Sequence, residues 1–431
     1  PLRFAFDALL RCRAVTSSPW ARALPFVPAL VVIAAAALTP MSELHSNQGD
    51  VGLYLEKARA LVSGLVPYRD FPFEYPPLAL VPMVVPYLFW PFGTVNLEAY
   101  RWLFAGWEAV LMLGLGTVLV RIVRLVDAVD GDEVRSMALR LIVLTAGAAL
   151  AITWRYDLYP ALLVMVALRA ALEGRAGAAG VAIGLGVLAK LYPLAVVPAL
   201  AIPWLVPLDR PRLVRYGLSV ALTIGLLMAP FVLLAGGDAF AFLSYQGQRG
   251  LQIESIGGGL AVLIGLLTGH RPDLSFGFSA VQVAGPFAEA WLRLLPLATV
   301  AGFAALGWLG WRRLRAGPVP PAAVIAFAGA AVLMLVATSK VFSIQYVVWI
   351  VPFAAFMSGR RFWLAAALVA LTMPIHPLLY GDLVKQAPLP ILILNARNAL
   401  FLALTAWTIW DLARSDASEG ALADRPDRGA A

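Results

Sequence analysis

Apolar stretches long enough to cross a membrane recur along most of this 431-residue chain. A helix of about 20 apolar residues spans the roughly 30 Å of hydrocarbon in a bilayer. Counting about twelve such stretches by this measure, we expect an all-α polytopic membrane protein with both termini on one side. The expected spans begin near Leu24, Tyr100, Met137, Asp157, Gly177, Leu191, Val214, Phe287, Ala322, Gln345, Arg361 and Leu389. The segments around Trp154 and Tyr192 are short, so we expect tilted or broken helices there.

The composition excludes several other classes of protein. Hydrophobic residues make up 61% of the chain and charged residues 13%, whereas soluble domains have about 45–50% and about 25%. A chain of this length cannot hide such an excess from water, which excludes an ordinary soluble enzyme, a disordered chain and a disulfide-stapled scaffold. One cysteine and three histidines also make a thiolate or histidine-rich metal site improbable.

The positive charges predict the orientation of the chain in the membrane. The net charge is +8, and the cations are scattered between apolar runs, which argues against nucleic acid as a partner. With the expected spans, 21 of the 33 lysines and arginines fall on the side of the N-terminus. Cytoplasmic loops carry the excess of such residues, so we expect both termini in the cytoplasm and the long loops outside a cell membrane.

We expect one transmembrane domain over residues 1–410, followed by a disordered cytoplasmic tail over 411–431. The first apolar run is interpreted as a retained anchor, since no small-residue cleavage site follows the basic leader. Two expected outer loops, 41–98 and 236–286, are too long to be simple connectors.

The first outer loop contains two segments that suit a membrane surface. Its first segment predicts an amphipathic interfacial helix, whose apolar face comprises Tyr54, Leu55, Ala58, Leu61, Val62 and Leu65. The proline-rich segment from Pro76 to Trp90 is apolar, but a span there would reverse the distribution of charges. We expect this second segment to be interfacial or re-entrant.

Four cations lie at the outer ends of expected spans or just beyond them: Arg155, Lys190, Arg249 and Lys340. Charges next to hydrocarbon are costly and usually line a site, and an outward cluster of this kind suits a bound phosphate. Simpler interpretations stay open. Lys190 could only extend its ammonium to the interface, Arg155 could pair locally with Asp157, and Arg249 and Glu254 could lie in a solvated loop.

Asp50 also has two interpretations, an N-cap of the amphipathic helix or a general base held at the membrane surface. The run from Gly184 to Lys190 lacks the second glycine and the Ser or Thr of a nucleotide-binding loop, so Gly180 and Gly184 are interpreted as a close helix-packing pair. Tyr68 and Tyr75 are interpreted mainly as interface-belt aromatics.

Several short motifs, in order along the chain, resemble the GT-C polyprenyl-phosphate-sugar glycosyltransferases, and most of all glycosyltransferase family 87, which includes bacterial α-mannosyltransferases. The motifs are Asp50, Pro67-Tyr68, Tyr75-Pro76-Pro77-Leu78, Arg155-Tyr156-Asp157 with Pro160, Lys190-Leu191-Tyr192-Pro193, Arg249-Gly250-Leu251-Gln252-Ile253-Glu254-Ser255 and Ser339-Lys340-Val341-Phe342-Ser343 with Gln345-Tyr346. The resemblance extends from about Asp50 to about Pro352.

The resemblance implies a GT-C-like fold and a membrane hexosyltransferase that moves a sugar from a polyprenyl-phosphate donor to a lipid- or glycan-linked acceptor on the extracytoplasmic face. Mannose is the sugar that it favours. It assigns the catalytic base to Asp50, and the donor phosphate to Arg155, Lys190, Arg249 and Lys340. The expected substrate-binding residues are Tyr68, Glu74, Tyr75, Asp157, Glu254, Gln345 and His376. Many members carry an Asp-X-Asp or Glu-X-Asp pair and a divalent metal. Gln48 and Gly52 flank Asp50 here, so we expect no metal and no other cofactor.

Two other classes of function would place different demands on the chain. A transporter or flippase of a phosphorylated lipid or glycolipid would need a charged path toward the cytoplasm, and Glu108 is the main carboxylate within an expected span. A non-catalytic membrane scaffold would not need two large outer loops.

Overall fold

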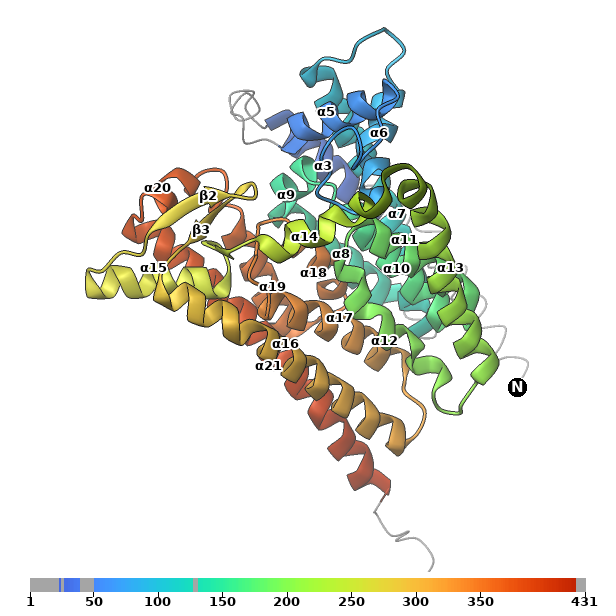
Figure 1. Cartoon of the computed structure of the whole chain (residues 1–431). Helices are drawn as coiled ribbons and strands as arrows, with labels where there is room; N and C mark the ends of the chain where they lie inside the picture. Colours follow the sequence, from blue (N-terminus) through green and yellow to red (C-terminus); the bar gives the residue numbers. More distant parts are fainter. Residues whose placement is uncertain (1–22, 25–26, 39–49, 127–130, 424–431) are drawn as a thin grey trace, which may run out of the picture.

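The computed structural model describes residues 23–24, 27–38, 50–126 and 131–423, so the expected basic leader lies outside the described residues. Most of the described chain is helical, as expected, and the helices pack into one bundle (Figure 1). The first half comprises α3 (Val27–Leu38), α5 (Asp50–Val62), η2 (Pro77–Ala79), α6 (Leu80–Leu88), α7 (Leu97–Val126), α8 (Gly131–Gly147), α9 (Ala149–Trp154), α10 (Leu158–Leu172), α11 (Ala176–Ala189), η3 (Tyr192–Val196), α12 (Val197–Ala201) and η4 (Ile202–Trp204).

The second half comprises α13 (Arg210–Ala235), η5 (Gly236–Phe240), α14 (Ala241–Gln248), β1 (Leu251–Gln252), α15 (Ile256–Thr268), β2 (Leu274–Gly277), β3 (Ala280–Val283), α16 (Pro286–Ala316), α17 (Pro321–Ala337), α18 (Tyr346–Ala354), α19 (Gly359–Thr372), α20 (Tyr380–Val384) and α21 (Pro388–Ala423). Each expected span therefore coincides with a helix or with a run of short helices. Among the described residues, four helices are long and apolar enough to cross a membrane: α7, the helical stretch that starts with α13, α16 and α21.

The outer surface of the bundle suits contact with lipid. In the most apolar 18-residue windows of α13 and α16, only 6% and 11% of the residues are buried. On α13 the exposed leucines Leu218, Leu222 and Leu226 recur every four residues and so form one stripe along the helix. A soluble protein would not leave such a stripe open to water, so these two helices face hydrocarbon.

The close approach of α11 to α13 depends on two glycines, as the sequence predicted. A Cβ atom on Gly180 would lie 2.5 Å from the carbonyl oxygen of Tyr216, and one on Gly184 would lie 2.9 Å from Cβ of Thr223. Small residues of this kind let transmembrane helices pack at short range.

Replacing Gly180 with Ala should therefore destabilise the fold by about 1–3 kcal/mol, the usual range for overpacking. The fixed backbone of α13 cannot yield without separating the two helices. The measurement is thermal unfolding in detergent. Gly217→Ala is the matched control, because Gly217 lies on α13 and a Cβ atom added there would meet nothing within 4 Å, and alanine favours a helix. Equal melting temperatures for the two variants would contradict the close contact.

The predicted amphipathic helix is present as α5. The first part of its apolar face packs on protein, whereas Val62 and Leu65, at and just beyond its end, are exposed. Val51, Tyr54 and Leu55 are buried, and the Tyr54 ring lies 5.6 Å from the Phe104 ring of α7. The proline-rich segment forms η2 and α6, which is too short to span a membrane and receives a hydrogen bond from Tyr100 Oη to Met83 O at 2.7 Å. The expectation that lipid covers this face is thus corrected for Tyr54, Leu55 and Ala58, because α5 packs there against α6 and α7.

The expectation of a purely helical chain is also wrong in one place. Between α13 and α16, three short strands form an antiparallel sheet in the order β1-β3-β2. Phe278 and Ser279, the two residues between β2 and β3, both have positive φ angles, of 52° and 57°. Such turns normally carry Asn or Gly, so the sequence lacked the usual hairpin signal, and the strands are too short to show alternation.

The expected end of the transmembrane domain at residue 410 is not the end of its last helix. The helix α21 continues through Asp411 to Ala423, and residues 424–431 lie outside the described residues. Arg361 Nη1 of α19 contacts Asp411 Oδ2 at 2.6 Å, and Leu412 is buried in the core. These tertiary contacts stabilise the first turns beyond residue 410, although the local composition there is that of a polar tail.

Candidate active site

Two broken helices place cations at the same end of the bundle as α5 and α6. The helix α9 ends at Trp154 and Arg155 is extended, with φ −134° and ψ 138°. In the same way, α11 ends at Ala189 and Lys190 is extended, with φ −161° and ψ 150°. The breaks expected near Trp154 and Tyr192 are therefore confirmed. A cation at a helix C-terminus is favoured by the partial negative charge of the last carbonyl groups.

Each of these cations has a carboxylate partner that is distant in the sequence. Arg155 Nη1 pairs with Asp50 Oδ2 of α5. Lys190 Nζ donates to Asp157 Oδ1 at 2.7 Å, and Trp349 Nε1 donates to the same oxygen at 2.5 Å. The interpretation of Arg155 and Asp157 as a local ion pair is therefore wrong, because the docked α5 supplies a better-placed carboxylate for Arg155.

Asp50 occupies the first residue of α5 with a carboxylate that remains partly open. Its side chain is 26% exposed, and Tyr54 Oη donates to Oδ2 at 3.4 Å. Burial raises the pKa of Asp50, and the guanidinium of Arg155 opposes that shift; Glu74 and Asp157 raise the pKa further, while Lys190 lowers it. The carboxylate thus interacts electrostatically with Glu74 and with the charged groups of both ion pairs.

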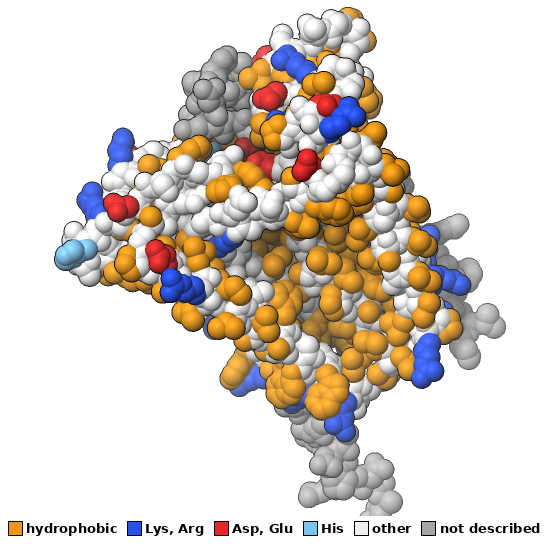
Figure 2. Space-filling view, in the orientation of Figure 1, with side chains coloured by type: hydrophobic (Ala, Val, Ile, Leu, Met, Phe, Trp, Pro, Cys, Tyr) orange, Lys and Arg blue, Asp and Glu red, His pale blue; other side chains and the backbone are white. Residues whose placement is uncertain are grey.

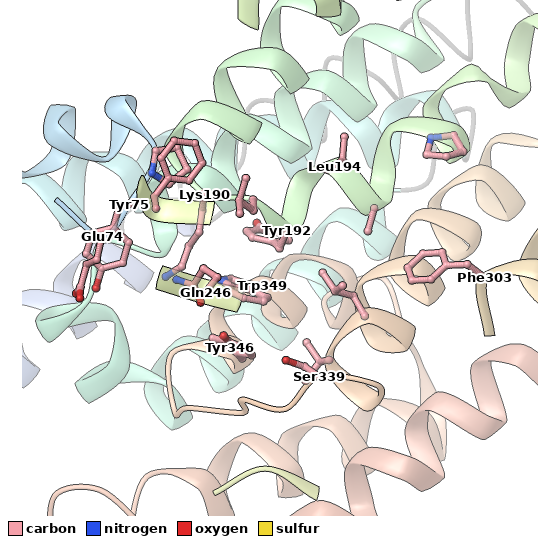
Figure 3. A pocket seen from close by; sticks show the side chains of 17 residues that line it. Glu74, Tyr75, Lys190, Tyr192, Leu194, Gln246, Phe303, Ser339, Tyr346 and Trp349 are labelled. Carbon is pink, nitrogen blue, oxygen red and sulfur yellow. The ribbon is translucent and has the colours of Figure 1, made fainter. Parts of the chain in front are cut away.

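A cavity of about 540 Å³ has Lys190 in its wall, whereas Asp50, Arg155 and Asp157 are not among its lining residues (Figure 3). Glu74, Lys190 and Gln246 gather at one end of it, whereas Leu194 and Phe303 lie toward the other. The lining residues are Glu74, Tyr75, Pro76, Lys190, Leu191, Tyr192, Leu194, Ala195, Pro198, Phe242, Gln246, Phe303, Leu335, Val336, Ser339, Tyr346 and Trp349. One end can bind a polar headgroup, and the other can bind only an apolar chain.

Aromatic rings fix the position of the Lys190 ammonium at the polar end. Nζ lies 4.8 Å from the Tyr156 ring and 5.5 Å from the Trp349 ring. Trp349 is in turn stacked between Tyr192 at 4.1 Å and Tyr346 at 3.9 Å. The ammonium is therefore held by Asp157 and by these rings with little freedom, so that it is already in place for an anion.

Tyr68 and Tyr75, interpreted from the sequence as interface-belt residues, are interior to the folded loop. Tyr68 is buried and its hydroxyl donates to the carbonyl oxygen of Tyr75 at 2.7 Å. The Tyr75 ring packs edge-on against Tyr156 at 5.3 Å and also lines the cavity. Tyr68 therefore shapes the loop, and only Tyr75 reaches the site.

Glu254 does not lie in a solvated loop. Its exposed fraction is 4%, and Gln252 Nε2 donates to Glu254 Oε2 at 2.7 Å. Burial raises the pKa of Glu254 to about 7, against the positive charges of Arg397, Arg155 and Arg249. This carboxyl group thus lies within electrostatic range of the same arginine that pairs with Asp50.

Because the folded protein keeps the Glu254 proton up to about pH 7 and the unfolded chain loses it near 4.5, the native state binds more protons between these values. The raised pKa of Glu254 therefore contributes roughly 3 kcal/mol to the free energy of unfolding. This contribution is complete below pH 4.5 and is lost as the pH rises to about 7. Glu254→Gln should remove this dependence, measured as the free energy of unfolding in detergent at pH 5 and pH 8. Glu289→Gln, at a side chain that is 67% exposed, should retain it. If the free energy of unfolding of Glu254→Gln depended on pH as in the wild type, the dependence could not be assigned to Glu254.

The remaining predicted residues, Arg249, Lys340, Gln345 and His376, are not among the residues that line the cavity. Lys340 Nζ donates to Gly247 O at 2.7 Å, and burial together with the charge of Arg249 lowers the pKa of Lys340. Buried Gln345 Oε1 and His376 Nδ1 have no hydrogen-bond partner among the described residues. Burial, with the charge of Arg155, lowers the pKa of His376 to about 4.

Two residues that the sequence reasoning missed, Trp349 and Arg397, contact predicted site residues. Trp349 donates to Asp157, and its only sequence signal was an aromatic residue in an apolar run. Arg397 is fully buried in α21. An arginine inside an expected span is itself a signal of function.

The donor set does not fit a metal ion well. No group of three His, Cys, Asp or Glu side chains lies close enough together to hold one in the part of the chain that the structure describes. Asp50 and Asp157 each contact a cation directly, and such pairing already satisfies their charge. The groups placed to stabilise an anion at this site are therefore Arg and Lys side chains.

No protein-family model and no curated protein matches the chain. Among solved structures, the chain is similar to ArnT from Cupriavidus metallidurans bound to undecaprenyl phosphate, with 17% identity, 94% of this chain and 79% of that chain covered, and a TM-score of 0.47. It is also similar to the Archaeoglobus fulgidus oligosaccharyltransferase in the apo form (15% identity, 94% and 56% covered, TM-score 0.45). A third similar structure is AglB from the same organism in complex with an inhibitory peptide and a dolichol-phosphate (15% identity, 93% and 56% covered, TM-score 0.44). The chain spans just over half the length of these two archaeal chains.

Proposed function

We propose that this protein is a GT-C-type membrane glycosyltransferase. It transfers a sugar from a polyprenyl-phosphate donor to a lipid- or glycan-linked acceptor, with inversion at the anomeric carbon. We infer that this sugar is mannose. The observation that carries this proposal is the cavity with Lys190 at its polar end and apolar residues at the other. The partly open carboxylate of Asp50 lies within electrostatic range of that Lys190. A lipid-linked sugar phosphate has the same division into a polar and an apolar part.

The apolar end of the cavity continues toward the lipid-facing surface. Figure 2 shows a hollow between α13 and α16 whose visible surface is mostly apolar, while charged side chains gather above it around α5 and α6. Leu194 of η3, Leu335 of α17 and Phe303 of α16 line the cavity. A polyprenyl chain could therefore remain in hydrocarbon while its phosphate contacts Lys190, since burial of the chain needs only apolar walls.

In the proposed reaction, the ionised carboxylate of Asp50 takes the proton of an acceptor hydroxyl. The hydroxyl oxygen attacks the anomeric carbon, the bond from that carbon to the phosphate oxygen breaks, and the electron pair leaves with the polyprenyl phosphate. Direct displacement with one base inverts the anomeric centre, through an oxocarbenium-like transition state. Arg155 keeps Asp50 ionised and fixes its position.

Lys190 stabilises the departing phosphate. Its ammonium has three N–H donors, of which the contact with Asp157 uses one. Negative charge increases on the phosphate as the bond breaks, so a cation that is fixed in a partly dry site favours the transition state. In this proposal Arg249 and Lys340 also contact the phosphate.

One observation favours this reaction over the alternative, a transporter or flippase. Glu108 of α7 is fully buried, and neither of its carboxylate oxygens has a hydrogen-bond partner in the described chain. It therefore extends no charged path from the site toward the other end of the bundle. The arginines at that other end, Arg210, Arg212 and Arg312 among them, support cytoplasmic termini and an extracytoplasmic site in the cell membrane.

The direct test uses the purified protein in nanodiscs with a short-chain polyprenyl-phosphate mannose and a membrane lipid extract as acceptor. We expect free polyprenyl phosphate and a mannosylated product, both detected by mass spectrometry. A polyprenyl-phosphate pentose in a parallel reaction distinguishes the sugar. The proposal would be overturned if the protein bound neither donor and released no polyprenyl phosphate from either of them.

A further inference from the structure

Arg397 lies in the first third of α21 and is fully buried. Nη2 donates to the carbonyl oxygen of Glu254 at 2.8 Å, and Nη1 donates to that of Phe342 at 3.4 Å. The guanidinium carbon also lies 3.9 Å from the centre of the Phe342 ring. A buried charge in a membrane helix is costly and is usually retained for function, and this one contacts two segments that each carry predicted phosphate-binding cations.

The two segments, 249–254 and 339–345, are held together beside Arg397 by the amide of one side chain. Gln252 Nε2 donates to Ser343 Oγ at 2.8 Å, and Gln252 Oε1 accepts from the Phe342 N–H at 2.9 Å. The backbone N–H of Gln252 donates to the carbonyl oxygen of Lys340 at 3.0 Å. Asn398, next to Arg397, donates to Ser255 O at 3.2 Å. These two segments, far apart in the sequence, thus share one anchor on α21.

We propose that Arg397 is a positioning residue that holds Arg249 and Lys340 together for the donor phosphate, through the carbonyl groups of Glu254 and Phe342. This inference rests on the proposed function. Arg249 and Lys340 repel one another, since each has a positive charge. Arg397 adds to the hydrogen bonds of Gln252 that hold their segments together against this repulsion. Holding two like charges together before the ligand binds lets an anion gain both contacts without first ordering the loops.

The geometry explains why this position is an arginine. Its planar fork presents separate N–H groups to two carbonyl oxygens, which the single ammonium of a lysine could not reach at once. Both partners are neutral carbonyl groups, and the Glu254 carboxyl is bonded to Gln252 instead. The positive charge of Arg397 is therefore left to act on the site, together with Arg155 and Arg249.

The test compares Arg397→Met and Arg397→Lys with Arg414→Met. Arg414 lies on the same helix and is exposed, and its guanidinium carbon lies over the Trp410 ring at 4.5 Å, so Arg414→Met is the matched control. Two measurements are made on full-length protein in nanodiscs: amide hydrogen exchange of residues 249–255 and 339–345, and the KM and kcat for a short-chain polyprenyl-phosphate mannose.

Arg397→Met should speed exchange in both segments and raise the donor KM about tenfold, the loss expected for hydrogen bonds from a charged group, with a much smaller change in kcat. Arg397→Lys should fold and give an intermediate KM, and Arg414→Met should match the wild type. A proportional loss of folded protein and kcat with an unchanged donor KM would overturn the proposal, as would unchanged exchange in either Arg397 variant. If the wild type itself transfers no sugar, the proposed function fails, while the exchange measurement still decides whether Arg397 anchors the two segments.

Discussion

Asp50→Asn should lower kcat for the proposed sugar transfer by about 10²–10⁴-fold, the usual contribution of a general base. The amide has nearly the same shape as the carboxylate and can still accept from Tyr54, but it cannot take a proton. The donor KM should change little, because the carboxylate acts mainly as the acceptor hydroxyl loses its proton. Burial raises the pKa of Asp50, so wild-type activity should fall on acidification at a pH above the usual range of an aspartate.

The control for this variant is Asp70→Asn in the same loop. Asp70 is paired with Arg69 and accepts from the Val66 N–H at 2.7 Å, away from the cavity. We expect near wild-type turnover from it, measured as release of polyprenyl phosphate. Because Asp50→Asn leaves Arg155 without its carboxylate partner, melting temperature and monodispersity must accompany the rates. Wild-type turnover in folded Asp50→Asn would remove this residue from the mechanism.

Lys190→Met should lower kcat/KM by about 10²-fold or more, because removal of one fixed charge-stabilising group from an active site has effects of that size. The same substitution leaves the fully buried Asp157 without its cation, which should also destabilise the fold by about 3–5 kcal/mol. A simple loss of activity in the single variant would therefore have two explanations.

The double variant Lys190→Met with Asp157→Asn separates them. The neutral amide can still accept from Trp349, so the double variant should regain most of the lost melting temperature. Its kcat/KM should remain low, because the ammonium that contacts the phosphate is still absent. The same pair of changes at Lys385 and Asp382, an exposed ion pair at 3.3 Å, is the matched control. Recovery of both stability and transfer in the Lys190/Asp157 double variant would show that Lys190 has only a structural role.

Much of the architecture could be predicted because lipid imposes a simple rule on sequence. A spanning segment must be apolar over its length and satisfy its own backbone, so runs such as those of α13 and α16 are visible in composition alone. The same rule made Gly180 and Gly184 recognisable as a packing pair, and the breaks at Arg155 and Lys190 recognisable as charged interruptions of apolar runs. Errors arose where protein replaced lipid or water as the neighbour, as on the apolar face of α5 and beyond residue 410 of α21.

By itself, the sequence determined which segments enter hydrocarbon and which charged groups stand at their ends, because the free energy of burying a side chain in lipid depends on that side chain and a few neighbours. Only the tertiary structure decided the pairing: Asp50 with Arg155, Asp157 with Lys190 and Trp349, and Arg397 with two distant carbonyl groups. Such contacts join segments that lie far apart along the chain. Their formation depends on how whole helices dock, and no local pattern in the chain encodes that docking.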